Sequence, residues 1–276
     1  MVKSVVWTQS RARLQLVRGA EDTDINWLFL PGGPGLGSES LRSLIEILKL
    51  PGNLWLLDLP GDGSNTTSNN AESFSKWEAA LVEAVSRFEH VILVAHSTGG
   101  MYALSLPELE TLLKGLVLLD SAPNAEWQEA FAEVVREFPI QGLDVLQAQY
   151  EQHPNNQILK DVTLASAPYL FTERGQASGI ELLRSLHYNY ETCQWSATYF
   201  DRTYQAKWVP KAIRTLILAG ENDQITPLRL FLNDERFNRQ ENIIFKSIKG
   251  AGHFPWIENP AEVAEAFSAY VIEESL

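Results

Sequence analysis

The sequence predicts an α/β protein with a mostly parallel eight-stranded sheet, helices on both faces and an inserted helical cap. Short apolar runs alternate with helix-length segments along most of the 276 residues, which is typical of parallel strands covered on both sides. Between residues 124 and 206 this rhythm breaks and no buried-strand run is evident. With 45% apolar and 21% charged residues, the chain has enough apolar side chains to bury a hydrophobic core.

Eight runs are predicted to be strands. They cover residues 2–7, 14–18, 27–30, 54–57, 91–94, 116–119, 213–218 and 243–245. Most are rich in Val, Ile, Leu or aromatic residues and are bounded by turn-forming residues such as Pro31 or Gly61. The continuous apolar runs indicate central strands that are buried on both faces.

Helical periodicity marks the segments between these strands. Residues 40–50 and 74–88 place apolar side chains on one helix face, and a last helix begins near Pro260 and runs towards residue 271. Helices are also predicted at residues 125–138, 143–152, 180–190 and 195–204. The predicted organisation is therefore a core of residues 1–123 and 207–276, with a cap, or lid, of residues 124–206.

Residues 95–100, Ala-His-Ser-Thr-Gly-Gly, connect a predicted strand to a predicted helix. A serine at such a corner, between small residues, is how a hydrolase exposes a nucleophile. The helix that follows directs free N–H groups and its positive end at a developing anion. Ser97 could instead only cap this helix. The two alternatives differ in whether a base lies nearby, because a serine hydroxyl alone is a poor nucleophile.

His253 is the histidine whose position best suits that base. It lies in a glycine-rich loop after residues 243–245 and before the last helix, at the sheet edge where open α/β sheets place their sites. By strand alternation, His96 is expected to point away from the face of Ser97. The orienting acid should lie between serine and histidine in the chain. Asp223 fits this order, and Asp120, one strand earlier, is the rival.

An oxyanion site would require two backbone N–H donors near the serine. The residue after the nucleophile, Thr98, supplies the first. Residues 30–35, Leu-Pro-Gly-Gly-Pro-Gly, follow an early strand and supply the second, with Gly33 as the expected donor. Glycine at this position lets the backbone approach a substrate closely.

Together these motifs resemble the α/β-hydrolase superfamily. Residues 32–35, Gly-Gly-Pro-Gly, are similar to its oxyanion motif, and residues 58–64, Asp-Leu-Pro-Gly-Asp-Gly-Ser, to its D-x-x-G-x-G-x-S loop. The resemblance covers nearly the whole chain except the insertion. It implies a Ser97, Asp223 and His253 triad that works without cofactor or metal.

Two positions depart from the family pattern. Ala95 replaces the first glycine of G-x-S-x-G, which adds a methyl group at the corner. Pro31 replaces the usual histidine of the oxyanion loop, so the loop must be stiffened by a fixed φ instead of by a ring hydrogen bond. Neither departure removes a group of the triad.

The expected activity is hydrolysis of a small carboxylic ester or related acyl substrate through an acyl-enzyme. Alternatives on the same triad are C–C bond hydrolysis, cofactor-less oxygenation, or an aminopeptidase resembling proline iminopeptidases, whose oxyanion loop also reads G-G-P-G. An aminopeptidase of this kind would need an acid in the predicted cap, such as Glu173, Glu181 or Glu191, to bind the free amine of its substrate. The non-enzyme alternative is a binding protein on the same fold.

The composition of the chain limits the classes of partner that it is expected to bind. A formal net charge of −13 repels nucleic acid and anionic membranes. No apolar run approaches the ~20 residues of a membrane span, and the start of the chain lacks the features of a signal peptide, so a cytoplasmic protein is expected. The single cysteine, Cys193, excludes an internal disulfide. Trp127, Trp195 and Trp208 are candidates for ligand contact or for packing.

Overall fold

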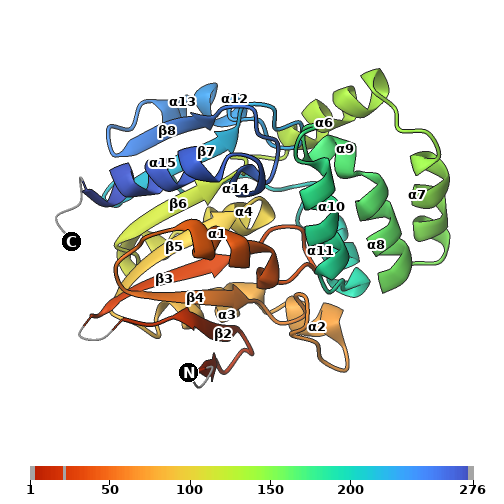
Figure 1. Cartoon of the computed structure of the whole chain (residues 1–276). Helices are drawn as coiled ribbons and strands as arrows, with labels where there is room; N and C mark the ends of the chain where they lie inside the picture. Colours follow the sequence, from red (N-terminus) through yellow and green to blue (C-terminus); the bar gives the residue numbers. More distant parts are fainter. Residues whose placement is uncertain (1–3, 21–22, 273–276) are drawn as a thin grey trace.

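A computed structural model describes residues 4–20 and 23–272 of the chain (Figure 1). One eight-stranded sheet runs through it, in the order β1-β2-β4-β3-β5-β6-β7-β8. The strands are β1 (Val5–Trp7), β2 (Arg13–Arg18), β3 (Ile25–Leu30), β4 (Asn53–Asp58), β5 (His90–His96), β6 (Gly115–Leu119), β7 (Arg214–Gly220) and β8 (Ile243–Ile248). The β1–β2 and β2–β4 pairs are antiparallel, and every other pair in this sheet is parallel. The predicted fold class is confirmed, although residues 2 and 3 of the first predicted run lie outside the described residues.

Helices cover both faces of the sheet (Figure 1). On one face, α1 (Arg42–Ile47) and α15 (Pro260–Ile272) pack against Trp27 and Phe29 of β3. On the other face, α3 (Trp77–Val85), α4 (Thr98–Ala103) and the short α5 (Leu109–Leu112) pack against Leu28 and Leu30 of the same strand. Because neighbouring strand residues point to opposite faces and both faces are buried, the strand is apolar along most of its length.

Two predicted core helices differ in their bounds. The predicted helix at residues 40–50 is a 3-10 turn, η1 (Ser38–Leu41), followed by α1, which ends at Ile47. Pro51 disfavours helical backbone at the residue before it, so the chain is extended before β4. The segment predicted at residues 74–88 is divided into α2 (Asn70–Phe74) and α3. The Asn69 side chain accepts the Glu72 N–H and starts α2 earlier than the apolar pattern indicated.

Residues 124–206 form six helices between β6 and β7, beside one end of the sheet (Figure 1). They are α6 (Glu126–Glu137), α7 (Leu143–Gln152), α8 (Asn156–Ala165), α9 (Ala167–Leu170), α10 (Gln176–Ser185) and α11 (Tyr190–Tyr199). The sequence indicated neither α8 nor α9, and it placed the last two helices about five residues late. The ends of the segment meet, because the Ala206 N–H donates to the Pro123 carbonyl and the Ala125 N–H to the Tyr204 carbonyl.

Strand order reverses beside β3, since β4 lies on one side of it and β5 on the other. Leu30 at the end of β3 pairs with Ala95 near the end of β5. The loops that leave these two strands therefore emerge next to each other, which is where ligand sites form in open parallel sheets. The remaining short helices, α12 (Arg229–Leu232), α13 (Glu235–Asn238) and α14 (Pro255–Glu258), follow β7 and β8. Within the described ranges, no helix combines the length and apolar character needed to cross a bilayer.

Candidate active site

Ser97 occupies the corner between β5 and α4 in an uncommon backbone conformation, with φ 52° and ψ −123°. A non-glycine residue rarely adopts a positive φ, and such strain persists only where its surroundings enforce it. Here the Ser97 N–H donates to the Leu119 carbonyl at 2.8 Å, and the Ser121 hydroxyl donates to the Ser97 carbonyl at 2.8 Å. Both contacts come from the end of the neighbouring strand, β6. The Ser97 side chain makes no capping bond to α4, so it is free for another partner.

That partner is His253. The Ser97 Oγ lies 3.0 Å from His253 Nε2, and His253 Nδ1 lies 3.1 Å from both carboxylate oxygens of Asp223. All three side chains are buried. These distances suit hydrogen bonds along the whole series, which is the arrangement needed to move a proton from a hydroxyl to an imidazole held by a carboxylate.

The surroundings of Asp223 favour the ionised form of its carboxyl group. Burial raises the pKa of this carboxyl, but His253 and two backbone N–H groups outweigh burial, and the pKa is below its ordinary value. The donors are Ile225 at 2.9 Å and Thr226 at 3.3 Å, both in the turn that follows. A charged carboxylate beside Nδ1 favours the imidazole tautomer whose Nε2 can accept a proton.

The rival acid, Asp120, lies nearby but in a different role. Its Oδ1 accepts the Gly220 N–H at 2.8 Å and thereby joins the ends of β6 and β7. Burial, followed by the negative charge of Asp223, raises the pKa of Asp120 well above its ordinary value. The structure brings Asp223, the acid that the sequence favoured over Asp120, to hydrogen-bond distance of the His253 imidazole.

One group of side chains in the described part of the chain comes close enough to hold a metal ion. It consists of Asp120, Asp223 and His253, whose nearest ligand atoms lie within 4.8 Å of one another. Both nitrogens of His253 already face other partners, Asp223 on one side and Ser97 on the other. The arrangement of these contacts suits proton transfer, because metal ligation would use a nitrogen that either partner needs.

The expectation that His96 points away from the site is wrong. Its Nε2 donates to the backbone carbonyl of His253 at 3.0 Å, and the two rings lie 4.9 Å apart between centroids. Burial lowers the pKa of His96 to about 3, so the ring is neutral. The prediction used only the alternation of side chains along β5. It took no account of the loop after β8, which brings His253 into contact with the His96 ring.

The loop after β3 packs directly on the Ser97 corner. A Cβ added at Gly32 would lie 2.4 Å from the Ser97 Cβ and 2.5 Å from the His96 carbonyl. Gly33 has φ +66°, a conformation that favours glycine. The Gly33 and Thr98 N–H groups donate to no other atom in the described part of the chain, and both residues line the cavity at Ser97. Two unused donors at one nucleophile are the components of an oxyanion site.

Gly32→Ala is expected to lower kcat for ester hydrolysis by roughly 10²–10³-fold, the loss typical of a damaged oxyanion site. The added methyl group cannot fit between loop and corner, so either the loop or Ser97 must move. Kinetics with a p-nitrophenyl ester and a thermal melt check this expectation. Gly19→Ala is the matched control, since its Cβ would meet only side-chain atoms, the nearest at 3.3 Å. Wild-type kcat in Gly32→Ala would show that this close contact does not position the donors.

A cavity of about 240 Å³ opens over Ser97 and His253. Its walls come from the loop after β3, the serine corner and α6, α8, α10 and α11 of the helical segment. Most lining side chains are apolar. The lining includes Trp127, which the sequence offered as a candidate for ligand contact or packing, and also Cys193 and Asp201, which the sequence did not connect with the site. Burial raises the pKa of the Cys193 thiol to about 11, so it stays protonated at neutral pH.

Most of the acids and tryptophans that the sequence offered for substrate contact lie outside the cavity at Ser97. Glu173 and Glu181 are exposed, and Glu191 accepts a hydrogen bond from the Asn70 side chain at 2.7 Å. None of these three acids lines the cavity at Ser97. Trp195 packs on Phe74, with ring centroids 5.3 Å apart. Trp208 packs against the core, and its indole N–H donates to the backbone carbonyl at the end of α4. Only Trp127 of the three tryptophans reaches the cavity.

Glu258 in α14 joins the histidine loop to the helical segment. One of its oxygens accepts the Thr172 N–H at 2.9 Å and the Thr172 hydroxyl at 2.5 Å, and the other accepts the Gly252 N–H at 2.6 Å. The neighbouring His253 N–H donates to the Leu170 carbonyl at 2.8 Å. The C-terminal end of α9, the residue Thr172 that follows it and the loop that carries the histidine are therefore bonded to one another.

Glu258→Gln is expected to lower the free energy of unfolding by about 1.5–3 kcal/mol, the usual contribution of hydrogen bonds to a buried charged group. The amide keeps the size of the side chain but replaces one accepting oxygen with a donor that faces a backbone N–H. Urea denaturation measures the change. Glu265→Gln, on the exposed side of α15, is the control and should have little effect. Equal stability of Glu258→Gln and wild type would contradict the proposed contact.

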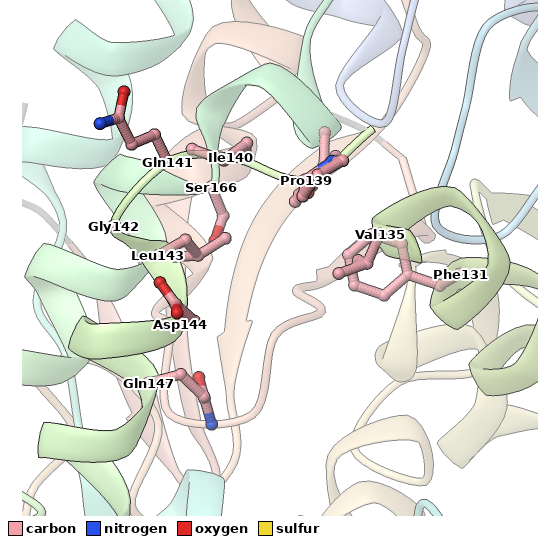
Figure 2. Close-up of a pocket in the computed structure, with 11 residues that line it drawn as sticks. Phe131, Val135, Pro139, Ile140, Gln141, Gly142, Leu143, Asp144, Gln147 and Ser166 are labelled. Carbon is pink, nitrogen blue, oxygen red and sulfur yellow. The ribbon is translucent and has the colours of Figure 1, made fainter. Parts of the chain in front are cut away.

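A larger cavity, of about 710 Å³, lies wholly within the helical segment (Figure 2). Phe131 and Val135 of α6 lie across it from Leu143, Asp144 and Gln147 near the start of α7. No residue of the Ser97 site lines it, and it holds no nucleophile beside a base. The smaller cavity, onto which the hydrogen-bonded series of Ser97 and His253 opens, is therefore the candidate active site in spite of its lower volume.

Comparison with known proteins agrees with this geometry. A model of the alpha/beta hydrolase family matches residues 27–266. Among curated proteins, the chain is 21% identical to a pimeloyl-[acyl-carrier protein] methyl ester esterase of Xylella fastidiosa, over 88% of this chain and 94% of that protein. It is 24% identical to a putative esterase/lipase of Mycoplasma genitalium, over 87% of this chain and 85% of that protein.

Solved structures show the same fold. The proline iminopeptidase-related protein of Thermus thermophilus superposes with a TM-score of 0.72 at 20% identity, covering 99% of this chain and 98% of that one. The family model spans most of β3, the strands β4 to β8, the serine corner, the helical segment and the histidine loop in one continuous match. The chain belongs to the alpha/beta hydrolase family.

Proposed function

We propose that this protein is a serine hydrolase that cleaves small carboxylic esters through an acyl-enzyme. The observation that carries the proposal is the unbroken hydrogen-bonded series from Ser97 through His253 to Asp223, at the base of a mostly apolar cavity. The names of its curated relatives, which are esterases and an esterase/lipase, support the same reaction class.

In the proposed mechanism, the Ser97 hydroxyl attacks the ester carbonyl while His253 Nε2 takes its proton. The Gly33 and Thr98 N–H groups stabilise the oxyanion of the tetrahedral intermediate. The alcohol then leaves with the proton from His253, and Ser97 remains acylated. A water molecule loses a proton to His253 and attacks the acyl group, which releases the carboxylic acid and restores Ser97. Asp223 stabilises the positively charged imidazole in both halves.

We further propose that residues 124–206 act as a cap over this cavity, with the core formed by residues 1–123 and 207–276. The helical segment supplies much of the cavity's lining and is bonded to the histidine loop through Glu258. A cap of this kind excludes water and shapes the acyl site. At about 240 Å³ the cavity lies below the usual range of drug-sized pockets, which favours a small substrate. A cytoplasmic location stays a prediction.

A fluorophosphonate probe tests the nucleophile directly, because it reacts with activated serines. We expect the wild-type protein to be labelled and Ser97→Ala to remain unlabelled. A screen of p-nitrophenyl esters of graded acyl length then tests the substrate class, with hydrolysis expected to be faster for short acyl groups. Failure to label wild type, or equal labelling of Ser97→Ala, would overturn the proposal.

A further inference from the structure

Asp201 is a charged side chain placed in an otherwise mostly apolar substrate cavity. It follows α11 and lines the cavity that holds Ser97 and His253. Its Oδ1 accepts the Ser196 hydroxyl at 3.0 Å. Its Oδ2 has no hydrogen-bond partner, and the carboxylate has no ion pair, among residues 4–20 and 23–272. Partial burial of a carboxylate is unfavourable without a cation, so one oxygen is available to a ligand.

Trp127 lines the same part of the helical segment as this carboxylate. Both residues line the catalytic cavity and also an adjoining cleft between α6 and α11. The neighbouring Gln128 side chain donates to the Asp201 carbonyl at 2.6 Å, which holds the start of α6 against this turn. An indole ring and a carboxylate on one wall are the two groups that bind ammonium ions in proteins, through ring electrostatics and charge-assisted hydrogen bonds.

The other charged groups near this wall leave the subsite negative. Arg136, in the outer cleft, is paired with Glu129 at 3.0 Å, and Arg202 lies in the same cleft but does not line the catalytic cavity. Tyr102 and Cys193, which face Asp201 from α4 and α11, are neutral because burial raises both of their pKa values. Residues 124–206 as a whole carry eleven acidic and five basic side chains, so the field of the cap favours cations.

Building on the proposed ester hydrolysis, we propose that Asp201 and Trp127 form a subsite for an ammonium group. The preferred substrates are then small esters that carry a primary ammonium at the end away from the scissile bond. The acids suggested by sequence do not reach the cavity, whereas Asp201 does. This subsite determines specificity and takes no part in the bond-breaking step.

Two esters of equal heavy-atom count test this subsite. Methyl 6-aminohexanoate and methyl heptanoate differ only in an ammonium in place of a terminal methyl group, and released methanol reports both reactions. The measured quantity is the ratio of kcat/KM for the cationic ester to that for the neutral ester. We expect wild type to prefer the cationic ester and Asp201→Asn to reduce the ratio by roughly tenfold or more. Glu173→Gln, which removes an exposed acid of the same helical segment, is the matched control and should keep the wild-type ratio.

The pH dependence of the same ratio tests wild-type protein without any substitution. Burial raises the pKa of Asp201 to about 6. The carboxylate is charged above that pH and neutral below it, so the cationic preference should be present at pH 8 and decline towards pH 5. An effect of pH on the bond-breaking step is shared by both esters and cancels in the ratio.

The outcomes separate this inference from the proposed function. A ratio that falls in Asp201→Asn and declines below pH 6 supports the subsite. Hydrolysis of the neutral ester with a ratio that ignores both pH and Asp201→Asn overturns the subsite and leaves the esterase proposal intact. Absence of hydrolysis of either ester together with absence of fluorophosphonate labelling overturns both.

Discussion

Ser97→Ala and His253→Ala should each lower kcat for a p-nitrophenyl ester by roughly 10⁵–10⁶-fold, and the double variant should lose no more than either single one. The reason is geometric: the hydroxyl and the imidazole are hydrogen-bonded at 3.0 Å and act as one unit. Without the base the hydroxyl is a poor nucleophile, and without the hydroxyl the base has no proton to take. Steady-state kinetics of the three variants measure this directly.

Controls for these variants are available on the surface. Ser268→Ala and His187→Ala remove the same chemical groups at exposed positions and should keep wild-type kcat. Losses that simply add in the double variant would contradict a shared mechanism. They would indicate that Ser97 and His253 support activity by separate routes, for example through stability.

The second large effect is expected at the acid. Asp223→Asn should lower kcat by roughly 10⁴-fold, although the side chain keeps its size. An asparagine amide can donate to His253 Nδ1, which favours the opposite tautomer, with its proton on Nε2. That nitrogen then cannot accept the Ser97 proton. The loss should appear in kcat at every pH where wild type is active.

Asp120→Asn provides the matched comparison. Asp120 is equally buried, but it bonds to the Gly220 N–H, and an asparagine carbonyl can accept the same bond. A loss of less than tenfold is expected, because burial raises the pKa of Asp120 well above its ordinary value and a neutral amide suits the same buried environment. A larger loss in Asp120→Asn than in Asp223→Asn would reverse the assignment of the triad acid.

The parts of the site that sequence predicted are those defined over a few adjacent residues. The Ser97 corner follows from an apolar strand, small neighbours and a helix start, all within residues 91–104. The Gly33 loop follows from turn residues at the end of β3. Asp223 and His253 follow from chain order relative to strands, because the carboxyl ends of parallel strands share one edge. The structure brings all of these residues together, as expected.

The missed residues depend on contacts between distant segments. Asp201 is one acid among eleven in residues 124–206, and nothing in its neighbours distinguishes it from Glu173 or Glu181. Glu258 bonds to residues 6 and 86 positions away. His96 was set aside because alternation along its own strand carries no information about the loop that returns from β8. The sequence did not indicate α8 and α9, and apolar residues of both helices, among them Leu159, Ala167 and Leu170, pack in the cluster that includes one face of the sheet.

The local sequence was therefore enough to predict the α/β class, the succession of strands along the chain and the strand-to-helix corner at Ser97, between Ala95 and Gly100. Apolar periodicity and turn residues encode these features within one element and its flanks. The bond from Asp120 to the Gly220 N–H, the neutral His96 in contact with His253 and the carboxylate of Asp201 in the cavity required the folded chain. Each depends on burial and on a partner brought from another element, and these set charge and orientation in ways that spacing along a sequence does not record.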